Sequence, residues 1–205
     1  MAKFPILPRE FYLDPPDRVA RRLLGKLLVR RYRGESGSSR SERLTGRIVE
    51  IEAYFGLDDP AAHACAGKTA RNQVLFGPPG FAYVYFIYGM HFCLNISCEP
   101  EGQGSGVLLR ALEPVEGLAT MARLRGLEPG ASPRLLTSGP GRLCQALDIV
   151  RDTHNGIDVT SARSGLHVED DGCVPEVAVS RRIGIRKAAE RPLRFTVAGN
   201  RFVSR

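Results

Sequence analysis

Long apolar runs are missing from this sequence. No stretch approaches the roughly 18 consecutive apolar residues that mark a membrane-spanning helix, so we expect no association with a membrane. The opening residues, MAKFPILPREFY, lack the apolar core of a secretory signal peptide and reach prolines almost at once. Both absences favour a protein of the cytoplasm.

Cysteine is sparse and scattered as well. The five cysteines, at positions 65, 93, 98, 144 and 173, are odd in number and form no CxxC pair. This argues against a disulfide framework and against a zinc site. His63 and Cys65 are close in sequence but stand apart from other soft ligands. We expect reduced thiols in a cytosolic compartment, and neither a metal nor another cofactor.

Lysine is nearly absent among the basic residues. Of 29 basic residues only Lys3, Lys26, Lys68 and Lys187 are lysines, and with 22 acidic residues the net charge is +7 and the pI about 9.5. The arginine fork matches phosphate oxygens better than an ammonium group does. An anionic partner is therefore expected, nucleic acid first, although biased codon usage would give the same composition.

Helices are expected in three places. Residues 17–24 have helical apolar spacing, with Asp17 as a possible N-cap and Gly25 as the stop. Residues 114–127 are expected to form a helix that begins at its proline and carries a glutamate in its first turn. The stretch SGPGR, residues 138–142, opens a third helix.

Strand signals outnumber these helices and do not alternate with them. Residues 81–97, FAYVYFIYGMHFCLNIS, read as two strands joined by a short turn at Tyr88-Gly89-Met90, which is the pattern of a β-hairpin. The segment 34–45 is rich in glycine and serine and is predicted to be a flexible loop. Further strands are expected at 27–29, 47–54, 106–112, 164–169, 176–181 and 193–198.

The order of these elements predicts an α+β fold. Residues 1–205 form a single compact domain in this interpretation, with a mostly antiparallel, curved sheet flanked by helices and a protruding β-hairpin. The hydrophobic content of 43% is enough for one core of that size. Neither an internal repeat nor a linker between two cores is visible in the sequence.

The strand at 47–54 carries acidic and aromatic side chains on one face. Period-two alternation gives it two faces, with Val49, Ile51 and Ala53 on one and Ile48, Glu50, Glu52 and Tyr54 on the other. A carboxylate beside aromatic rings can be a general base whose proton affinity is set by burial. An exposed strand face that merely pairs with an arginine is the alternative, and the pattern leaves both open.

Arg110 stands among apolar residues in the strand GVLLRAL. If it is partly buried, its guanidinium needs an acceptor, and Glu52 is the natural partner. Such a pair would hold a water molecule between a base and a charged donor. If alternation instead turns Arg110 to solvent, no such pair forms, and the sequence does not separate the two arrangements.

The hairpin concentrates tyrosines. Tyr83 and Tyr85 share a face of the first strand, one face of which should be core, and Tyr83 is expected to be a packing residue. Tyr88 lies at the tip beside Gly89, where a solvated ring has no packing benefit. It could insert between DNA bases as a wedge, with nearby aromatics stacking on an extruded base, or it could fold back on the core.

Two arginines are placed where phosphate could bind. Arg142 follows the glycines of SGPGR at a helix start, and Arg71 begins the stretch RNQ (71–73) before the hairpin. Each signal is weak by itself, because many ordinary helices begin this way.

Taken together, the motifs resemble those of the alkyladenine (3-methyladenine) DNA glycosylase family. RIVEIEAY, DDPAAHA, RN, YVYFIYGMHFCLNIS, VLLRALEP, SGPGRLCQAL, RRIGI and RPLRF occur in the family's order, over nearly the whole chain. The resemblance implies a monofunctional base-excision repair enzyme, probing duplex DNA as a monomer. It would flip out alkylated or deaminated purines such as 3-methyladenine, 7-methylguanine, hypoxanthine and ethenoadenine, and hydrolyse their N-glycosidic bond to leave an abasic site.

The resemblance also implies roles for individual residues. Glu52 matches the general base and Arg110 the residue that helps to hold its water. Tyr88 matches the tyrosine that enters the minor groove and takes the place of the flipped nucleotide. Tyr54 and Tyr85 match the aromatic walls of the base pocket, and His63 completes it. Asn95 matches the residue that crowds the 2-amino group of normal guanine. In the same resemblance, Leu108 affects the volume of the pocket, and the Ile183 carbonyl faces the water.

One departure and three alternatives remain at this stage. His91 follows the tip where an aromatic residue is expected, which implies a less apolar far side of the hairpin and a different DNA contact. A non-catalytic nucleic-acid-binding module would keep the tyrosines and arginines without needing Glu52. A bifunctional glycosylase would need an amine nucleophile, for which Lys68 is the candidate. A transferase acting on nucleic-acid-like substrates has no cofactor motif to support it.

Overall fold

Eight strands pair into one antiparallel sheet in the part of the chain that the structure, a computed structural model, describes: residues 2–34, 41–87 and 89–204. The main strand order is β3-β4-β5-β2-β1-β6, and β7 and β8 join it because β8 pairs with β2. The strands are β1 (Leu27–Tyr32), β2 (Glu42–Tyr54), β3 (Ala82–Ile87), β4 (His91–Cys98), β5 (Ser105–Glu116), β6 (Leu166–Glu169), β7 (Val177–Ser180) and β8 (Arg194–Val197).

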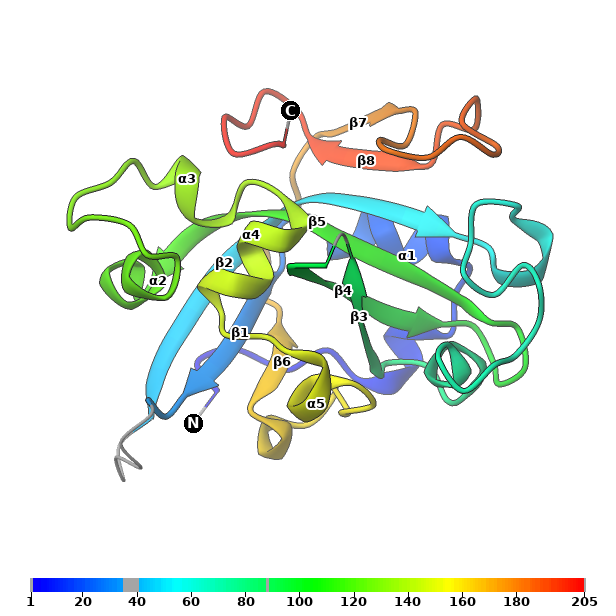
Figure 1. The fold of residues 1–205 in the computed structure, drawn as a ribbon, viewed down its shortest axis with the longest axis horizontal. Coiled ribbons are helices and arrows are strands. Elements are labelled where there is room, and N and C mark those ends of the chain that lie inside the picture. Colours follow the sequence, from blue (N-terminus) through cyan, green and yellow to red (C-terminus); the bar gives the residue numbers. More distant parts are fainter. Residues whose placement is uncertain (1, 35–40, 88, 205) are drawn as a thin grey trace.

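Short helices surround this sheet. α1 packs against β2 and β5, and α4 packs against β4 and β5; Figure 1 shows α4 in front of the strands and α1 behind them. This arrangement confirms the α+β class. No helix in the described ranges is long and apolar enough to cross a membrane. The α-helices are α1 (Pro16–Leu23), α2 (Leu118–Leu124), α3 (Arg134–Thr137), α4 (Pro140–Ala146) and α5 (Arg151–His154), and 3-10 turns span Arg9–Tyr12, Gly56–Asp58, Gln73–Phe76 and Ala162–Ser164.

The long strand β2 changes neighbours along its length. One edge pairs with β5 from Thr45 to Tyr54. The other edge pairs with β1 in the first half, where Glu42 lies opposite Tyr32, and with β8 in the second half, where Glu52 lies opposite Arg194. Figure 1 shows β8 beside the second half of β2, with the C-terminus close by. Residues near 50 are therefore flanked on both sides.

An irregularity in β2 overturns the predicted alternation of its side chains. The register against β5 shifts between Ile48 and Glu50 and again between Glu50 and Ile51. Ile48 belongs to the main core together with Ile51, whereas Val49 packs in a separate cluster with Ala111 and Phe202. The prediction that Ile48 shares the face of Glu50 is wrong, because a β-bulge adds a residue and exchanges the faces at that point.

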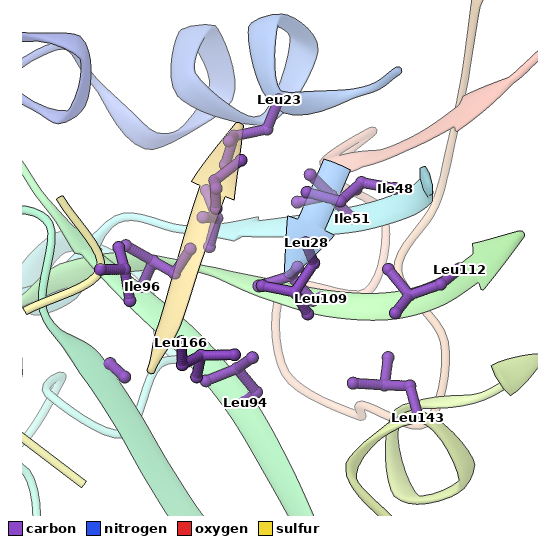
Figure 2. Packing of buried hydrophobic residues seen from close by; sticks show 14 of the residues in the cluster. Leu23, Leu28, Ile48, Ile51, Leu94, Ile96, Leu109, Leu112, Leu143 and Leu166 are labelled. Atoms are coloured by element: carbon purple, nitrogen blue, oxygen red, sulfur yellow. The ribbon is translucent and has the colours of Figure 1, made fainter. Parts of the chain in front are cut away.

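The core is built by the inner face of the sheet and the helices that cover it. It takes Val19 and Leu23 from α1, Met121 from α2 and Leu143 from α4. Figure 2 shows Leu143 near Leu112 of β5, and Leu23 on the other side of the strand residues. Each fully buried leucine or isoleucine contributes about 1.5–3 kcal/mol to folding. The result is a rigid platform for the opposite face of the strands.

The segment 114–127 differs from its prediction. The expected helix would begin at Pro114 with Glu116 in its first turn, but β5 continues to Glu116 and α2 begins only at Leu118. Gly117, with φ of +79°, separates the two elements. Pro114 lies at the register shift near Gly46, where a ladder hydrogen bond can be missing. Because the φ of proline suits both a helix start and an irregular strand position, the sequence signal is ambiguous.

The observed start of α1 and the observed start of β2 also differ from the predicted boundaries. Asp17 lies in the first turn of α1, whose N-cap is Pro15, so the predicted N-cap is wrong. β2 begins at Glu42, so the loop predicted over 34–45 is too long at its C-terminal end; residues 35–40 of that loop lie outside the described residues. The hairpin within 81–97 is confirmed, with Ile87 opposite His91.

Candidate active site

Residues from five neighbouring strands form a row across the sheet. Tyr83 on β3 lies opposite Asn95 on β4, Asn95 lies opposite Leu108 on β5, and Leu108 lies opposite Glu52 on β2. Glu52 in turn lies opposite Arg194 on β8. Side chains of residues paired in this way point to the same face of a sheet. The register therefore gathers predicted site residues that are far apart in the chain.

A cavity of about 440 Å³ opens on this face. That size is typical of sites for small organic ligands. Seven predicted site residues line it, namely Tyr54, His63, Tyr85, Asn95, Leu108, Arg110 and Ile183. Lys68 is exposed and does not line this cavity, so nothing here places the candidate amine nucleophile at the site.

Glu52 is fully buried and contacts three of the lining residues. Its Oε1 accepts a hydrogen bond from the Ile183 amide at 2.7 Å. Its Oε2 accepts from the Tyr54 hydroxyl at 2.9 Å and from Arg110 Nη1 at 3.2 Å. A buried carboxylate without such donors would be strongly unfavourable. The alternative of an exposed strand face is excluded, because Glu52 is fully buried.

Arg110 is 8% exposed and divides its guanidinium between two carboxylates. Nε donates to Glu50 at 2.9 Å and Nη1 to Glu52 at 3.2 Å. Burial alone would lower the pKa of Arg110, but the charges of Glu52 and Glu50 raise it. The predicted contact with Glu52 is confirmed, and the arginine stays charged at the wall of the cavity.

The aromatic side chains form a connected group. The His63 ring lies 4.4 Å from that of Tyr85, measured between centroids, and its Nδ1 lies 3.0 Å from the Tyr83 hydroxyl. Tyr83 is buried as expected of a packing residue, but it also lines the cavity and anchors His63. Burial, followed by the charge of Glu52, raises the pKa of Tyr54, so its phenol remains a neutral donor.

The surroundings of His63 favour its neutral form. Loss of hydration around the ring and then the positive charge of Arg71 lower the pKa of His63. His63 is exposed and lines the cavity. A neutral imidazole adds to the flat walls of the pocket without adding a second positive charge.

Three further predicted pocket residues lie near Glu52: Asn95, Leu108 and Ile183. The Asn95 amide donates to the Tyr83 carbonyl at 3.3 Å, which holds its side chain. Leu108 is 4% exposed and lies between Asn95 and Glu52 in the register. For Ile183 the bond to Glu52 comes from the main-chain N–H, whereas the sequence-based prediction concerns its carbonyl.

The two predicted phosphate ligands lie on different sides. Arg71 is exposed, with its guanidinium 5.8 Å from the centroid of the Tyr85 ring. Arg142 is exposed at the start of α4 and contacts the Ser138 carbonyl at 3.4 Å. With Arg110 and Arg134, Arg142 lines a second cavity of about 420 Å³. Both arginines offer donors to solvent, one beside the aromatic pocket and one behind Arg110.

The predicted wedge, Tyr88, lies outside the described residues. Around it, β3 ends at Ile87 and β4 begins at His91. Gly89 has φ of +70°, a conformation that favours glycine. Met90 is 70% exposed. The hairpin end thus presents an apolar side chain to solvent.

His91 and Cys93 also line the cavity, although the sequence marks His91 only as a departure near the hairpin tip and does not single out Cys93. A Cβ added to Gly141 would lie 3.0 Å from His91 Cγ, so the ring rests on the backbone of α4. His91 is thus half-buried between the cavity and α4. Period-two alternation from Asn95 would have found both residues, since positions 91, 93 and 95 share a face.

Sequence reasoning also missed a buried ion pair behind Tyr54. Arg182 donates to both carboxylate oxygens of Asp59 and, at 3.0 Å, to the Ala53 carbonyl. Nothing in the spacing of these residues pairs them. In the described part of the chain, no group of three or more His, Cys, Asp or Glu side chains could hold a metal ion.

Comparison with known proteins shows the family of this chain. The model of the family described as methylpurine-DNA glycosylase (MPG) matches residues 10–201. This chain belongs to the methylpurine-DNA glycosylase family. It is accordingly a monofunctional DNA glycosylase, a hydrolase of N-glycosyl bonds that acts in base-excision repair of DNA.

Relatives extend over the whole chain of this DNA glycosylase. A protein of Koribacter versatilis (strain Ellin345) is 56% identical over 205 residues, which cover 100% of this chain and 95% of the relative. A protein of Burkholderia cenocepacia (strain HI2424) is 46% identical over 97% of this chain and 91% of its own, and one of Rhodopseudomonas palustris (strain ATCC BAA-98 / CGA009) is 47% identical over 98% and 89%. All three carry the name "Putative 3-methyladenine DNA glycosylase".

Proposed function

We propose that this DNA glycosylase excises alkylated and deaminated purines, 3-methyladenine among them, with Glu52 as the base that activates water. The observation that carries the proposal is the position of Glu52. It is a fully buried carboxylate, and its three partners Arg110, Tyr54 and Ile183 line an aromatic cavity of about 440 Å³. The entire chain, residues 1–205, serves as one glycosylase domain in this proposal.

The chemistry follows from the charge that develops on the sugar. As the bond between C1′ and the purine nitrogen breaks, its electron pair leaves with the base and C1′ gains oxocarbenium character. The Glu52 carboxylate stabilises that positive charge and takes a proton from the water that attacks C1′. Arg110, and the Ile183 carbonyl in the role that the resemblance implies, hold this water. The products are the free base and an abasic site.

Selection of the damaged base rests on the aromatic walls. A purine alkylated on a ring nitrogen is cationic, so it is attracted to the faces of Tyr54 and Tyr85 and leaves readily as a neutral base. Neutral His63 completes the pocket without repelling such a cation. Asn95 would crowd the 2-amino group of a normal guanine, and Leu108 affects the volume of the pocket.

Duplex DNA containing a damaged purine is the proposed partner. Tyr88 enters the minor groove as a wedge, and Arg71 and Arg142 bind phosphates on either side of the pocket. The net charge of +7 favours approach to DNA. We propose that the enzyme acts as a monomer and in the cytoplasm, where bacterial DNA is found.

Substitution Glu52→Gln tests the proposal. It preserves the shape of the side chain and removes the base, so single-turnover excision from a hypoxanthine duplex should fall by about 10²- to 10⁴-fold. Binding of the same duplex should be retained. Excision at the wild-type rate would refute the role of Glu52, and a panel of 3-methyladenine, 7-methylguanine, hypoxanthine and ethenoadenine duplexes would establish the lesion range.

A further inference from the structure

A second buried glutamate lies two residues before the proposed base. Glu50 is 0% exposed and accepts four hydrogen bonds. They come from Arg110 Nε at 2.9 Å, Arg194 Nε at 2.7 Å, and the Ser204 amide and hydroxyl at 2.6 and 2.9 Å. We infer that Glu50 is a positioning residue, which fixes Arg110 against Glu52 and is itself held by the segment 194–204. The inference rests on the proposed function of Glu52.

The planar guanidinium of Arg110 transmits this constraint. Glu50 binds at Nε, whereas Glu52 binds at Nη1 of the same rigid group. Because the donors of a guanidinium lie in one plane at fixed angles, fixing the Nε–H direction also fixes where Nη1 points. Without Glu50 the arginine could rotate about its side chain and lose its contact with the base and its water.

The bulge in β2 makes this arrangement possible. Register shifts on either side of Glu50 place both Glu50 and Glu52 within reach of one arginine on β5. On the other edge, Thr196 and Arg194 of β8 lie opposite Glu50 and Glu52. Glu50 therefore lies at the junction of three strands, β2, β5 and β8.

Residues 194–204 close the back of this junction. Arg194 binds Glu50, donates from Nη1 to the Ser180 hydroxyl at 2.9 Å, and donates from Nη2 to the Ser204 carbonyl at 3.3 Å. Ser204 returns two donors to Glu50. None of these groups lines the aromatic cavity, so the segment acts on the reaction from outside the pocket, through Glu50 and Arg110 or through the pairing of β8 with Glu52.

The junction is also balanced in charge. Two carboxylates, Glu50 and Glu52, face two guanidiniums, Arg110 and Arg194. Removing the charge of Glu50 leaves one positive charge in excess beside Glu52, so protonation of that base requires a lower pH. Removing the charge of Arg194 leaves one negative charge in excess and has the opposite effect. Other charged or titratable groups around the junction are Tyr54 on β2, Cys93 on β4, the pair Arg182–Asp59, and Arg134 and Arg142 across the second cavity.

Glu50→Gln, measured by single-turnover excision as a function of pH, tests the inference. The rate at neutral pH should fall about 10- to 100-fold, as expected for a misplaced catalytic group, while binding of lesion DNA stays within about twofold. The acid limb of the rate profile should move to lower pH. Glu169→Gln is the matched control, because Glu169 is also 0% exposed and paired with an arginine but belongs to β6. An unshifted acid limb with a rate loss no larger than that of Glu169→Gln would overturn the inference.

A second variant tests the positioning role of Glu50 if Glu50→Gln does not fold. Arg194→Gln keeps the carboxylate of Glu50 and should move the acid limb to higher pH; an unchanged limb would contradict the charge balance. Failure of the proposed function is separable, since it would appear as excision that survives Glu52→Gln. Loss of excision in Glu52→Gln, with wild-type pH profiles in both junction variants, would remove only the role of Glu50.

Discussion

The guanidinium of Arg182 lies 4.6 Å from the centroid of the Tyr54 ring. Arg182 does not line the cavity, whereas Tyr54 does, so the arginine covers ring surface that a base cannot use. Its ion pair with Asp59 and its bond to the Ala53 carbonyl fix it in place. The residue after it, Ile183, donates to Glu52. One buried arginine therefore orders both an aromatic wall and a donor to the proposed base.

Arg182→Lys should make the positions of the Tyr54 ring and of the Ile183 amide less well defined. Lysine keeps the charge but cannot bind both oxygens of Asp59 as a planar fork, so we expect about tenfold slower excision and a loss of about 1–2 kcal/mol in the free energy of unfolding. Single-turnover kinetics and urea unfolding measure the two effects. Arg191→Lys is the control, because the Arg191 side chain donates to the Asp58 carbonyl, whereas Asp59 pairs with Arg182; this variant should remain close to wild type. Equal effects in the two variants would contradict the role of Arg182.

Tyr54→Phe separates the ring from the hydroxyl. The ring still stacks on a base, but Glu52 loses one of its three donors. Excision should fall by about 10- to 150-fold at most, since a hydrogen bond to a charged group contributes about 1.5–3 kcal/mol. The acid limb of the rate profile should move to higher pH, the direction opposite to Glu50→Gln. A profile that superimposes on that of the wild type would mean that the phenol does not support the base.

Tyr88→Ala tests the wedge predicted from the hairpin sequence. Base flipping should be impaired most for lesions that remain well stacked and paired, because damaged or mispaired bases are easier to extrude. Excision of hypoxanthine opposite thymine and opposite an abasic site provides the comparison. Equal rates for wild type and variant on the well-stacked lesion would eliminate the wedge.

Arg142→Gln should weaken DNA binding in a salt-dependent way. Loss of one phosphate contact reduces the slope of log Kd against log salt concentration by about one unit. Lesion and undamaged duplexes should be affected alike, since phosphate contacts carry no base information. Arg163→Gln, in the 3-10 turn Ala162–Ser164, is a control on exposed charge alone, and the same slope change there would argue against a specific phosphate site at Arg142.

Acid should destabilise the fold through Glu169. Burial would raise its pKa, but hydrogen bonds from Arg43 and His167 hold the pKa of Glu169 at about 2, below the ordinary value of 4.5. A carboxyl with a lowered folded-state pKa stabilises the fold fully above its unfolded value and loses this contribution as the pH falls from about 4.5 toward 2. The stability difference between wild type and Glu169→Gln, about 3–5 kcal/mol at pH 7 for a broken buried pair, should therefore shrink in urea titrations below pH 4.5. A difference that is constant with pH would show that the pair is not ionic.

Local patterns were sufficient for much of this fold. The hairpin over 81–97 and the strands at 166–169, 177–180 and 194–197 follow from alternation. The contact of Arg110 with Glu52 is one of two arrangements that the sequence leaves open. These features depend on a few neighbouring residues or on one strong acceptor. The resemblance to the family supplied the choice between the open alternatives for Glu52 and Arg110.

Features that depend on distant segments could not be predicted in this way. The bulge at Glu50 depends on how β2 aligns with β5, and a single strand contains no sign of it. The pair Arg182–Asp59 joins positions 123 residues apart. Pro114 is compatible with two conformations, and only the pairing of β5 with β2 decides between them. In each case the deciding interaction is made by a partner whose position is set by the whole fold.

The exchange of neighbours along β2 has a consequence for folding of the enzyme during its synthesis. The bond from Ser204 to Glu50 spans 154 residues of chain, and that from Ile183 to Glu52 spans 131. On a translating ribosome, β1, β2 and β5 can pair while β8 is still unmade, because domains begin to form as the chain emerges. Such a nascent chain already exposes arginines to nucleic acid but lacks the partners of Glu50 and Glu52. We expect the nascent chain to bind DNA before it has glycosylase activity. Hydrolysis of N-glycosidic bonds should begin only once residue 204 has left the ribosome.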